Sequence, residues 1–92
     1  MIRKYRKKPV IIEALQFDGT NSEEIELFTN GNARTLATHV PFMKVETLEG
    51  DMSINVDDWV IRGIKGEFYP CKPDIFAMTY AKVEDNIDAQ DM

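Results

Sequence analysis

The chain has 92 residues with a formal net charge of −5, and 43% of them are hydrophobic and 29% charged. This length and composition are typical of one small globular domain and exclude a second core, a collagen-like chain and a disulfide scaffold. The longest apolar run, residues 9–12, is far shorter than the roughly 18 residues of a membrane span, and the basic N-terminus lacks a signal peptide's apolar stretch. We therefore expect a cytoplasmic protein, without an internal disulfide because Cys71 is its only cysteine.

Basic and acidic residues are distributed unevenly along the chain. Five bases lie within residues 1–8, whereas residues 84–92 hold four acids and no base. Residues 9–83 hold twelve acids and six bases, so their formal charge is −6. We expect one folded domain over residues 1–83 and a disordered acidic tail over residues 84–92, which has too few apolar side chains to offset its ordering entropy.

The first predicted element is a strand over residues 8–17, which is rich in β-branched residues and ends at the turn pair formed by Asp18 and Gly19. Apolar side chains occupy both alternating sets of positions in this segment. Because each set points to one face of a sheet, the pattern predicts a central strand that is covered on both faces.

A helix is predicted over residues 22–29. Asn21 and Glu24 have the spacing of a capping box, and Gly31 stands where a C-terminal cap belongs. A helix this short is not stable alone in water, so its apolar side chains must dock on the sheet. These side chains are Ile25, Leu27 and Phe28.

Residues 31–41 are polar and irregular, which indicates a loop, and a short strand near Leu36 is an open alternative. A hairpin follows, with its turn at Glu49 and Gly50. This turn separates an apolar face from a polar face, and a shift of one residue would mix the two. The predicted facing pairs are Met43 with Val56, Lys44 with Asn55, Val45 with Ile54, Glu46 with Ser53, and Thr47 with Met52.

A second hairpin is predicted with its turn at Lys65 and Gly66. Pro70 has no amide hydrogen to donate, so residues 67–71 should form an edge strand. Trp59, Ile61 and Phe68 are expected to share one face. The predicted facing pairs are Gly63 with Phe68, Arg62 with Tyr69, and Val60 with Cys71.

The last predicted element is a short helix that begins at Pro73, with Asp74 as its cap and a short strand over residues 80–83 as an open possibility. Its inward side chains are expected to be Ile75, Phe76 and Met78. The element order predicts an α+β domain, namely a small twisted, mostly antiparallel sheet with two hairpins and one helix packed on a face.

Residues 4–17 and 58–80 resemble the small phage and prophage proteins that carry a PGDYG-type motif. The Pro-Gly-Asp-aromatic motif of that family falls on Val56, Asp57, Asp58 and Trp59. Asp57 stands at the position of the glycine, and aspartate tolerates left-handed turns better than most residues. The resemblance implies an origin in a phage or prophage of a bacterial host, and a role in modulating host or rival-phage machinery by binding.

No motif for catalysis, a cofactor or a metal stands out in the sequence. Glycine-rich phosphate loops and nucleophile elbows are missing, so we expect neither enzyme activity nor a cofactor. Zinc needs three or four ligands, whereas His39 and Cys71 are the only soft ones. Asp57 and Asp58 are too few for calcium, so a connecting turn is the simpler interpretation. Cys71 is interpreted as a small, buried or half-buried apolar residue on a strand.

The second hairpin carries the preferred binding surface. Arginine and tyrosine often anchor protein interfaces, and a cross-strand pair that merely covers the sheet is the alternative interpretation. The predicted protein-binding residues are Arg62, Glu67, Tyr69 and Lys72. We predict a non-enzymatic accessory module that binds a host or counter-defence protein.

Two other functions are kept as alternatives. The basic residues of the first segment could neutralise phosphates of a nucleic acid, although the acidic body argues against this and the lysines could simply protect a sheet edge. These residues are Arg3, Lys4, Arg6, Lys7 and Lys8. A pocket between helix and sheet could instead hold a small ligand. A half-exposed edge strand would also allow a homodimer.

Overall fold

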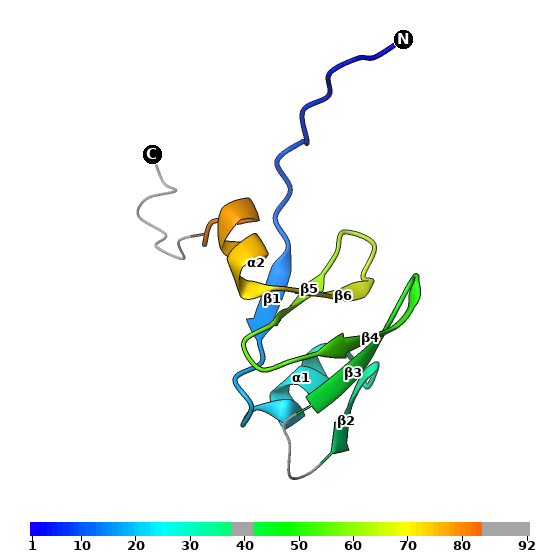
Figure 1. The fold of residues 1–92 in the computed structure, drawn as a ribbon, viewed down its shortest axis with the longest axis vertical. Helices are drawn as coiled ribbons and strands as arrows, with labels where there is room; N and C mark the ends of the chain where they lie inside the picture. Colours follow the sequence, from blue (N-terminus) through cyan, green and yellow to red (C-terminus); the bar gives the residue numbers. More distant parts are fainter. Residues whose placement is uncertain (38–41, 84–92) are drawn as a thin grey trace.

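The computed structural model describes residues 1–37 and 42–83, which contain six strands and two helices, with five of the strands between the two helices (Figure 1). Residues 1–12 form an extended arm that leaves the body before the first strand (Figure 1). The elements in chain order are β1 (Glu13–Gln16), α1 (Ser22–Phe28), β2 (Ala33–Ala37), β3 (Phe42–Thr47), β4 (Gly50–Ile54), β5 (Trp59–Arg62), β6 (Phe68–Cys71) and α2 (Pro73–Thr79). The predicted acidic tail over residues 84–92 lies outside the described residues.

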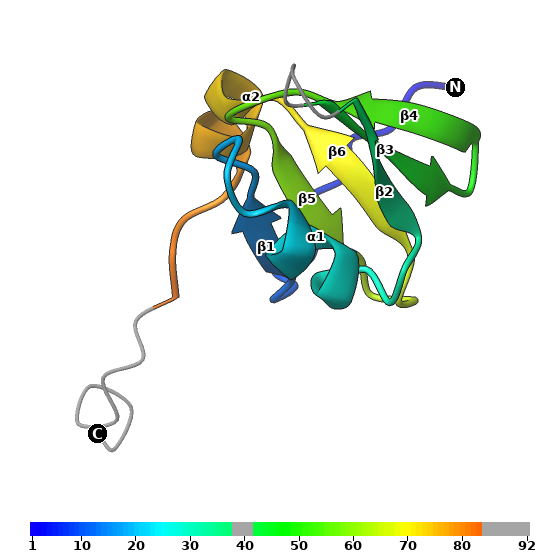
Figure 2. The same ribbon diagram turned by 90° about the horizontal axis from the view of Figure 1, so that it is seen from below.

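The strands form two antiparallel three-stranded sheets, with the orders β1-β5-β6 and β2-β3-β4. The mixed α+β class is therefore confirmed, but the strands do not join into one sheet as predicted. β6 of the first sheet packs against β3 and β4 of the second (Figure 2). β5 is the central strand of its sheet and β1 an edge strand, so the prediction of a central first strand is wrong.

The main core lies between the two sheets and α1. Its buried side chains alternate along β3, as half-buried strands require. Ile25 anchors α1 in this core and Phe28 packs against it, as predicted, whereas Leu27 is 79% exposed and does not dock. The buried cluster consists of Phe17, Ile25, Ala33, Met43, Val45, Ile54, Val60 and Phe68.

α1 confirms the predicted helix but not its capping box. The side chain of Asn21 makes no capping bond; it accepts a hydrogen bond from the Asp18 amide and donates one to the Gln16 carbonyl instead. Gly31 has φ +84° and its amide donates to the Glu26 carbonyl, which ends the helix as predicted.

The turn between β3 and β4 lies at Leu48 and Glu49, one position before the predicted turn. Thr47 faces Gly50, and the Thr47 hydroxyl both donates to the Gly50 carbonyl and accepts from the Glu49 amide. Each residue of β3 therefore faces a residue of β4 that lies two positions earlier than predicted. Side chains alternate between the faces with a period of two, so each one keeps its predicted face. The observed pairs include Met43 with Ile54, Lys44 with Ser53, and Val45 with Met52.

The connection between β5 and β6 is one residue longer than predicted. The Gly63 amide donates to the Glu67 carbonyl, and Gly66 takes the left-handed position of a three-residue loop, with φ +81°. The resulting shift of one position reverses the faces of β6 relative to β5. Phe68 therefore joins the main core, and it does not share a face with Trp59 and Ile61 as predicted. The observed pairs are Trp59 with Cys71, Val60 with Pro70, Ile61 with Tyr69, and Arg62 with Phe68.

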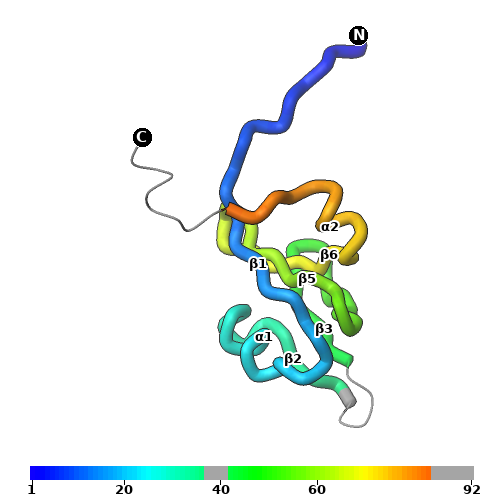
Figure 3. Tube along the Cα trace, turned by 90° about the vertical axis from the view of Figure 1, so that its left-hand side faces the viewer, coloured from blue at the N-terminus to red at the C-terminus, as the bar shows by residue number. Residues whose placement is uncertain are grey.

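The remaining elements differ from the predictions in detail. Residues 33–37 form β2, so the open strand alternative near Leu36 is correct. α2 begins at Pro73 with Lys72 as its N-cap, and Asp74 accepts a hydrogen bond from its neighbour's amide. Met78 is 82% exposed because α2 packs on the sheet through one side only, and the predicted strand over residues 80–83 is not formed. α1 and α2 lie on opposite sides of the first sheet (Figure 3).

Candidate interaction site

Three aromatic side chains stack in a row on the α2 side of the first sheet. Phe76 of α2 lies on the indole of Trp59 from β5, with 4.2 Å between ring centroids and 7° between ring planes. Tyr80 follows, 5.0 Å from the Phe76 ring, and Lys7 Nζ of the arm lies 5.5 Å from the Tyr80 centroid. We call Trp59, Phe76 and Tyr80 the aromatic ledge.

A groove of about 750 Å³ runs along β1 beside the aromatic ledge. Its wall includes six consecutive residues, 10–15, whose side chains alternate between the two faces of the sheet. Phe28 lines it from the α1 side and the aromatic ledge from the α2 side. A groove with walls on both faces of the first sheet must run past the outer edge of β1. We therefore call this hollow the edge groove.

Backbone groups along the outer edge of β1 are free to bond. The Phe17 amide donates to the Asp58 carbonyl and the Phe17 carbonyl accepts from the Asp57 amide, so Phe17 bonds toward β5. Bonding direction alternates along a strand, so Ala14 directs its amide and carbonyl groups outward, and Ile12, the last residue before β1, has the same position in the alternation. Within the described residues, these outward groups have no hydrogen-bond partner.

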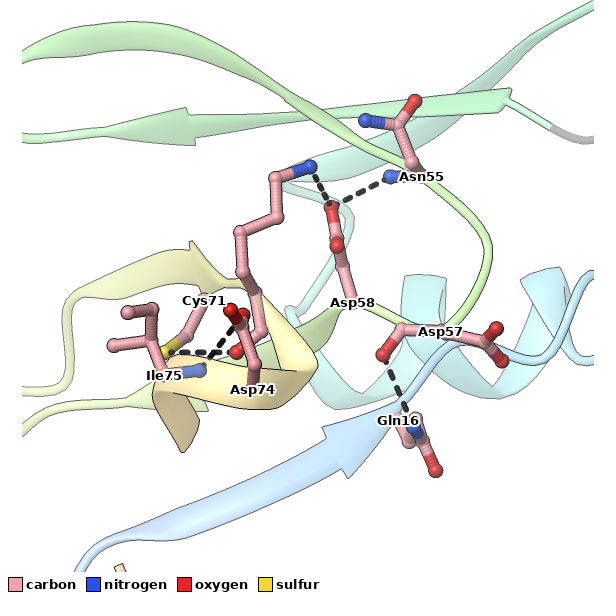
Figure 4. A network of polar contacts seen from close by, with 8 residues as sticks. Gln16, Asn55, Asp57, Asp58, Cys71, Asp74 and Ile75 are labelled. Atoms are coloured by element: carbon pink, nitrogen blue, oxygen red, sulfur yellow. Dashed lines mark hydrogen bonds and ion pairs between the residues drawn. The ribbon is translucent and has the colours of Figure 1, made fainter. Parts of the chain in front are cut away.

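A buried polar network fixes the position of α2 (Figure 4). Asp58 is 2% exposed, and its Oδ2 accepts from the Asn55 amide at 2.9 Å and from Lys72 Nζ at 3.3 Å. Lys72 is also the N-cap residue of α2. The ion pair thus holds the start of α2 against β5 and places Phe76 over Trp59.

Asp57, which the resemblance aligns with the glycine of the PGDYG-type motif, has φ +79°. Its amide donates to the Phe17 carbonyl at 2.6 Å, and its carbonyl accepts from Gln16 Nε2 at 3.0 Å (Figure 4). The left-handed turn considered for this position is therefore present. It ties the end of β1 to the start of β5.

The four predicted protein-binding residues do not share one face. Arg62 points to the α1 side, where its guanidinium bonds to Glu13 and to the Phe28 carbonyl and lies 4.6 Å from the Phe28 ring centroid. Tyr69 points to the α2 side, since it faces Ile61. Glu67 accepts from the Lys65 amide. The register shift of one position separates them, and Lys72 is engaged by Asp58.

The basic side chains of the arm are exposed. Both interpretations of this segment, nucleic-acid binding and protection of a sheet edge, require this exposure. Lys7 makes the cation–π contact with Tyr80. Binding of a nucleic acid by this set stays a prediction. Its members are Arg3, Lys4, Arg6, Lys7 and Lys8.

Cys71 is half-buried, and its surroundings do not activate it. Burial raises the pKa of its thiol, and the negative charges of Asp58 and Asp74 raise that pKa further. A raised pKa keeps the sulfur in the unreactive thiol form. Among the residues that the structure describes, no group of three or more His, Cys, Asp or Glu side chains could hold a metal ion, and His39 lies outside that set.

Sequence reasoning missed the aromatic ledge as a site. Phe76 was predicted to turn inward, but the contact of Trp59 with Phe76 depends on where α2 docks. The resemblance at residues 56–59 was the available signal, because these residues include both Trp59 and the buried Asp58 that anchors α2.

Comparison of the chain with models of protein families, with curated proteins and with solved structures gave no match. In the described part of the chain, neither helix is long and apolar enough to cross a membrane.

Proposed function

We propose that this protein is a non-enzymatic binding module that takes up an extended segment of a partner protein along the outer edge of β1. The observation that carries the proposal is that two features occur on the same edge. Ile12 and Ala14 have free backbone groups there, and an apolar groove runs beside them. An extended peptide that adds a strand to such an edge gains main-chain hydrogen bonds, and pockets beside the edge select its side chains.

The charges around the edge groove suggest the chemistry of the partner segment. Glu13 is paired with Arg62, which leaves Lys82 as the charge of the edge groove that carries no described ion pair. Lys7 and Lys8 line the adjoining hollow together with Glu67. Alternate side chains of an added strand would contact the aromatic ledge, and the others would point toward α1 and solvent. A segment that alternates apolar and acidic residues satisfies both conditions.

The resemblance to phage and prophage proteins indicates which class of partner this module would bind. Such a protein would act on a host protein or on a counter-defence protein of a rival phage, and edge pairing needs no catalytic residue. The raised pKa of the Cys71 thiol agrees with a function that does not use this residue as a nucleophile.

A synthetic peptide of alternating valine and glutamate residues is the direct probe. Trp59 is the only tryptophan and lines the edge groove, so its fluorescence reports binding. We expect saturable binding to the native protein, and a loss of at least about tenfold in affinity with Ile12→Glu, since a carboxylate in the apolar groove repels the acidic peptide and opposes edge pairing.

Met78→Glu is the matched control, because it adds the same charge at a side chain on α2 that is 82% exposed and outside the groove. This variant should bind like the native protein. Equal loss in both variants, or no saturable binding by the native protein, would reject the proposal. Salt-sensitive retention on single-stranded DNA without any binding of the peptide would favour the basic arm as a nucleic-acid site.

A further inference from the structure

We infer that in the free protein the edge formed by β1 and the extended residues 10–12 before it pairs with the same edge of a second copy, in an antiparallel and two-fold symmetric arrangement centred on Ile12. The inference uses the edge of the proposed function and adds its regulation, because a partner segment must displace the second copy. Residues 10–15 include no proline or lysine, two of the usual protections of an edge strand.

The arm and the body of the protein carry opposite charges. Residues 1–8 hold five bases and residues 9–83 have a formal charge of −6. The arm extends away from its own body, and Lys7 makes its one cation–π contact within the described residues (Figure 1). Antiparallel pairing of two copies of β1 lays each arm along the acidic body of the other copy, where the attraction is favourable.

The sequence of the edge selects the register of this pairing. Ile12 of one copy faces Ile12 of the other, and both direct their backbone groups outward, as a hydrogen-bonded pair requires. Two of the pairs near the centre are apolar and the third sets an isoleucine beside a glutamate, and a base faces an acid beyond them. The resulting pairs are Val10 with Ala14, Pro9 with Leu15, Ile11 with Glu13, and Arg6 with Asp18.

Neighbouring registers are less favourable. A centre one residue earlier moves Arg6 from Asp18 to the uncharged Gln16. A centre at Glu13 sets two carboxylates against each other, which destabilises a strand pair. A centre at Ala14 places Ile12 opposite Gln16, whose outward carbonyl already accepts a hydrogen bond from an asparagine side chain.

Disulfide trapping tests the register directly. In a Cys71→Ser background, Ile12→Cys puts two sulfurs on facing residues, whose Cα atoms lie about 5.5 Å apart in a hydrogen-bonded pair, within disulfide range. We expect rapid oxidation to a covalent dimer of twice 10.6 kDa. Val10→Cys is the matched control, because its counterpart on the other copy lies four residues along the strand, about 13 Å away.

Val10→Cys alone should stay monomeric, whereas a mixture of Val10→Cys and Ala14→Cys chains should form a disulfide between the two. Trapping of Val10→Cys as fast as Ile12→Cys would overturn the inference. Charge provides a second readout: Arg6→Glu should weaken the dimer about tenfold, and Arg3→Glu, which has no acid opposite it, should weaken it less.

Light scattering over a roughly hundredfold range of protein concentration separates this inference from the proposed function. A native protein that stays monomeric throughout yet binds the valine–glutamate peptide refutes the dimer and leaves the proposed function standing. A dimer that is trapped through Ile12→Cys while the peptide never binds supports the dimer and removes the proposed function. If both hold, the peptide should dissociate the dimer as it binds.

Discussion

Lys72 Nζ lies 3.3 Å from Oδ2 of Asp58, and the two side chains differ sharply in exposure, at 59% and 3% respectively. Water can therefore reach the ammonium group but not the carboxylate. The same Asp58 oxygen also accepts from the Asn55 amide. Loss of the acid leaves a part-buried amide without its acceptor, whereas loss of the base leaves a carboxylate that keeps one donor.

Asp58→Ala should therefore destabilise the fold more than Lys72→Ala. We expect a decrease of about 2–3 kcal/mol in the free energy of unfolding for Asp58→Ala, since a charged acceptor is lost. Lys72→Ala should cost about 1 kcal/mol or less, as solvent screens the exposed partner. Urea unfolding measures both values, and an equal cost for the two variants would contradict the asymmetry described here.

Asp57→Gly should raise the stability of the protein, or at least preserve it. Asp57 has φ +79°, a conformation in which a Cβ atom is strained and glycine is not. Its hydrogen bonds to Phe17 and Gln16 use backbone atoms, which glycine retains. The glycine variant should exceed Asp57→Ala by about 1 kcal/mol in the free energy of unfolding. The same ranking by thermal denaturation would support it, and a more stable alanine variant would refute it.

The Phe76 ring should hold α2 on the sheet. No residue of α2 is fully buried, so its docking depends on the stack with Trp59. We expect Phe76→Ala to shift the Trp59 fluorescence to longer wavelength and to cost about 1.5–3 kcal/mol, below the range of a fully buried phenylalanine. Met78→Ala, on the exposed side of the same helix, should change stability by less than about 0.5 kcal/mol. An unshifted fluorescence in Phe76→Ala would show that other contacts hold the helix.

Local patterns predicted those parts of the fold that depend on short sequence spacing. α1 follows from the apolar residues Ile25 and Phe28 and from the stop at Gly31, and the buried face of β3 follows from alternation. The β3–β4 turn was placed one position too late, yet the faces were right because partners moved by two. The β5–β6 loop was predicted one residue too short, and this error placed the side chains of β6 on the wrong faces of the sheet.

Features that depend on packing between distant segments could not be predicted. Apolar residues on both faces of residues 8–17 suggested a covered central strand, yet Ile11 is 76% exposed on an edge. The apolar residues on both faces of this segment instead line the two walls of the edge groove. Likewise, the aromatic ledge combines β5, α2 and the residue after α2, which are brought together by the stack of Trp59 with Phe76 and by the contact of Asp58 with Lys72.

Tyr69 should titrate later than an ordinary tyrosine. Burial, together with the neighbouring Tyr80 and the charge of Glu67, raises the pKa of Tyr69 to about 12 from its ordinary value of 10.0. Spectrophotometric titration of the three tyrosines should include a late phenolate step near that pH, and Tyr69→Phe should abolish this step.

Because the pKa of Tyr69 is raised in the folded protein, alkaline pH should lower the free energy of unfolding. The unfolded chain ionises Tyr69 first, near pH 10, whereas the folded protein keeps the phenol neutral until about pH 12. The contribution of this residue to stability is therefore complete below pH 10 and is lost as the pH rises through that interval. Urea midpoints measured across it should fall more steeply for the native protein than for Tyr69→Phe. Parallel decreases in the two proteins would show that the environment of Tyr69 does not favour its neutral form.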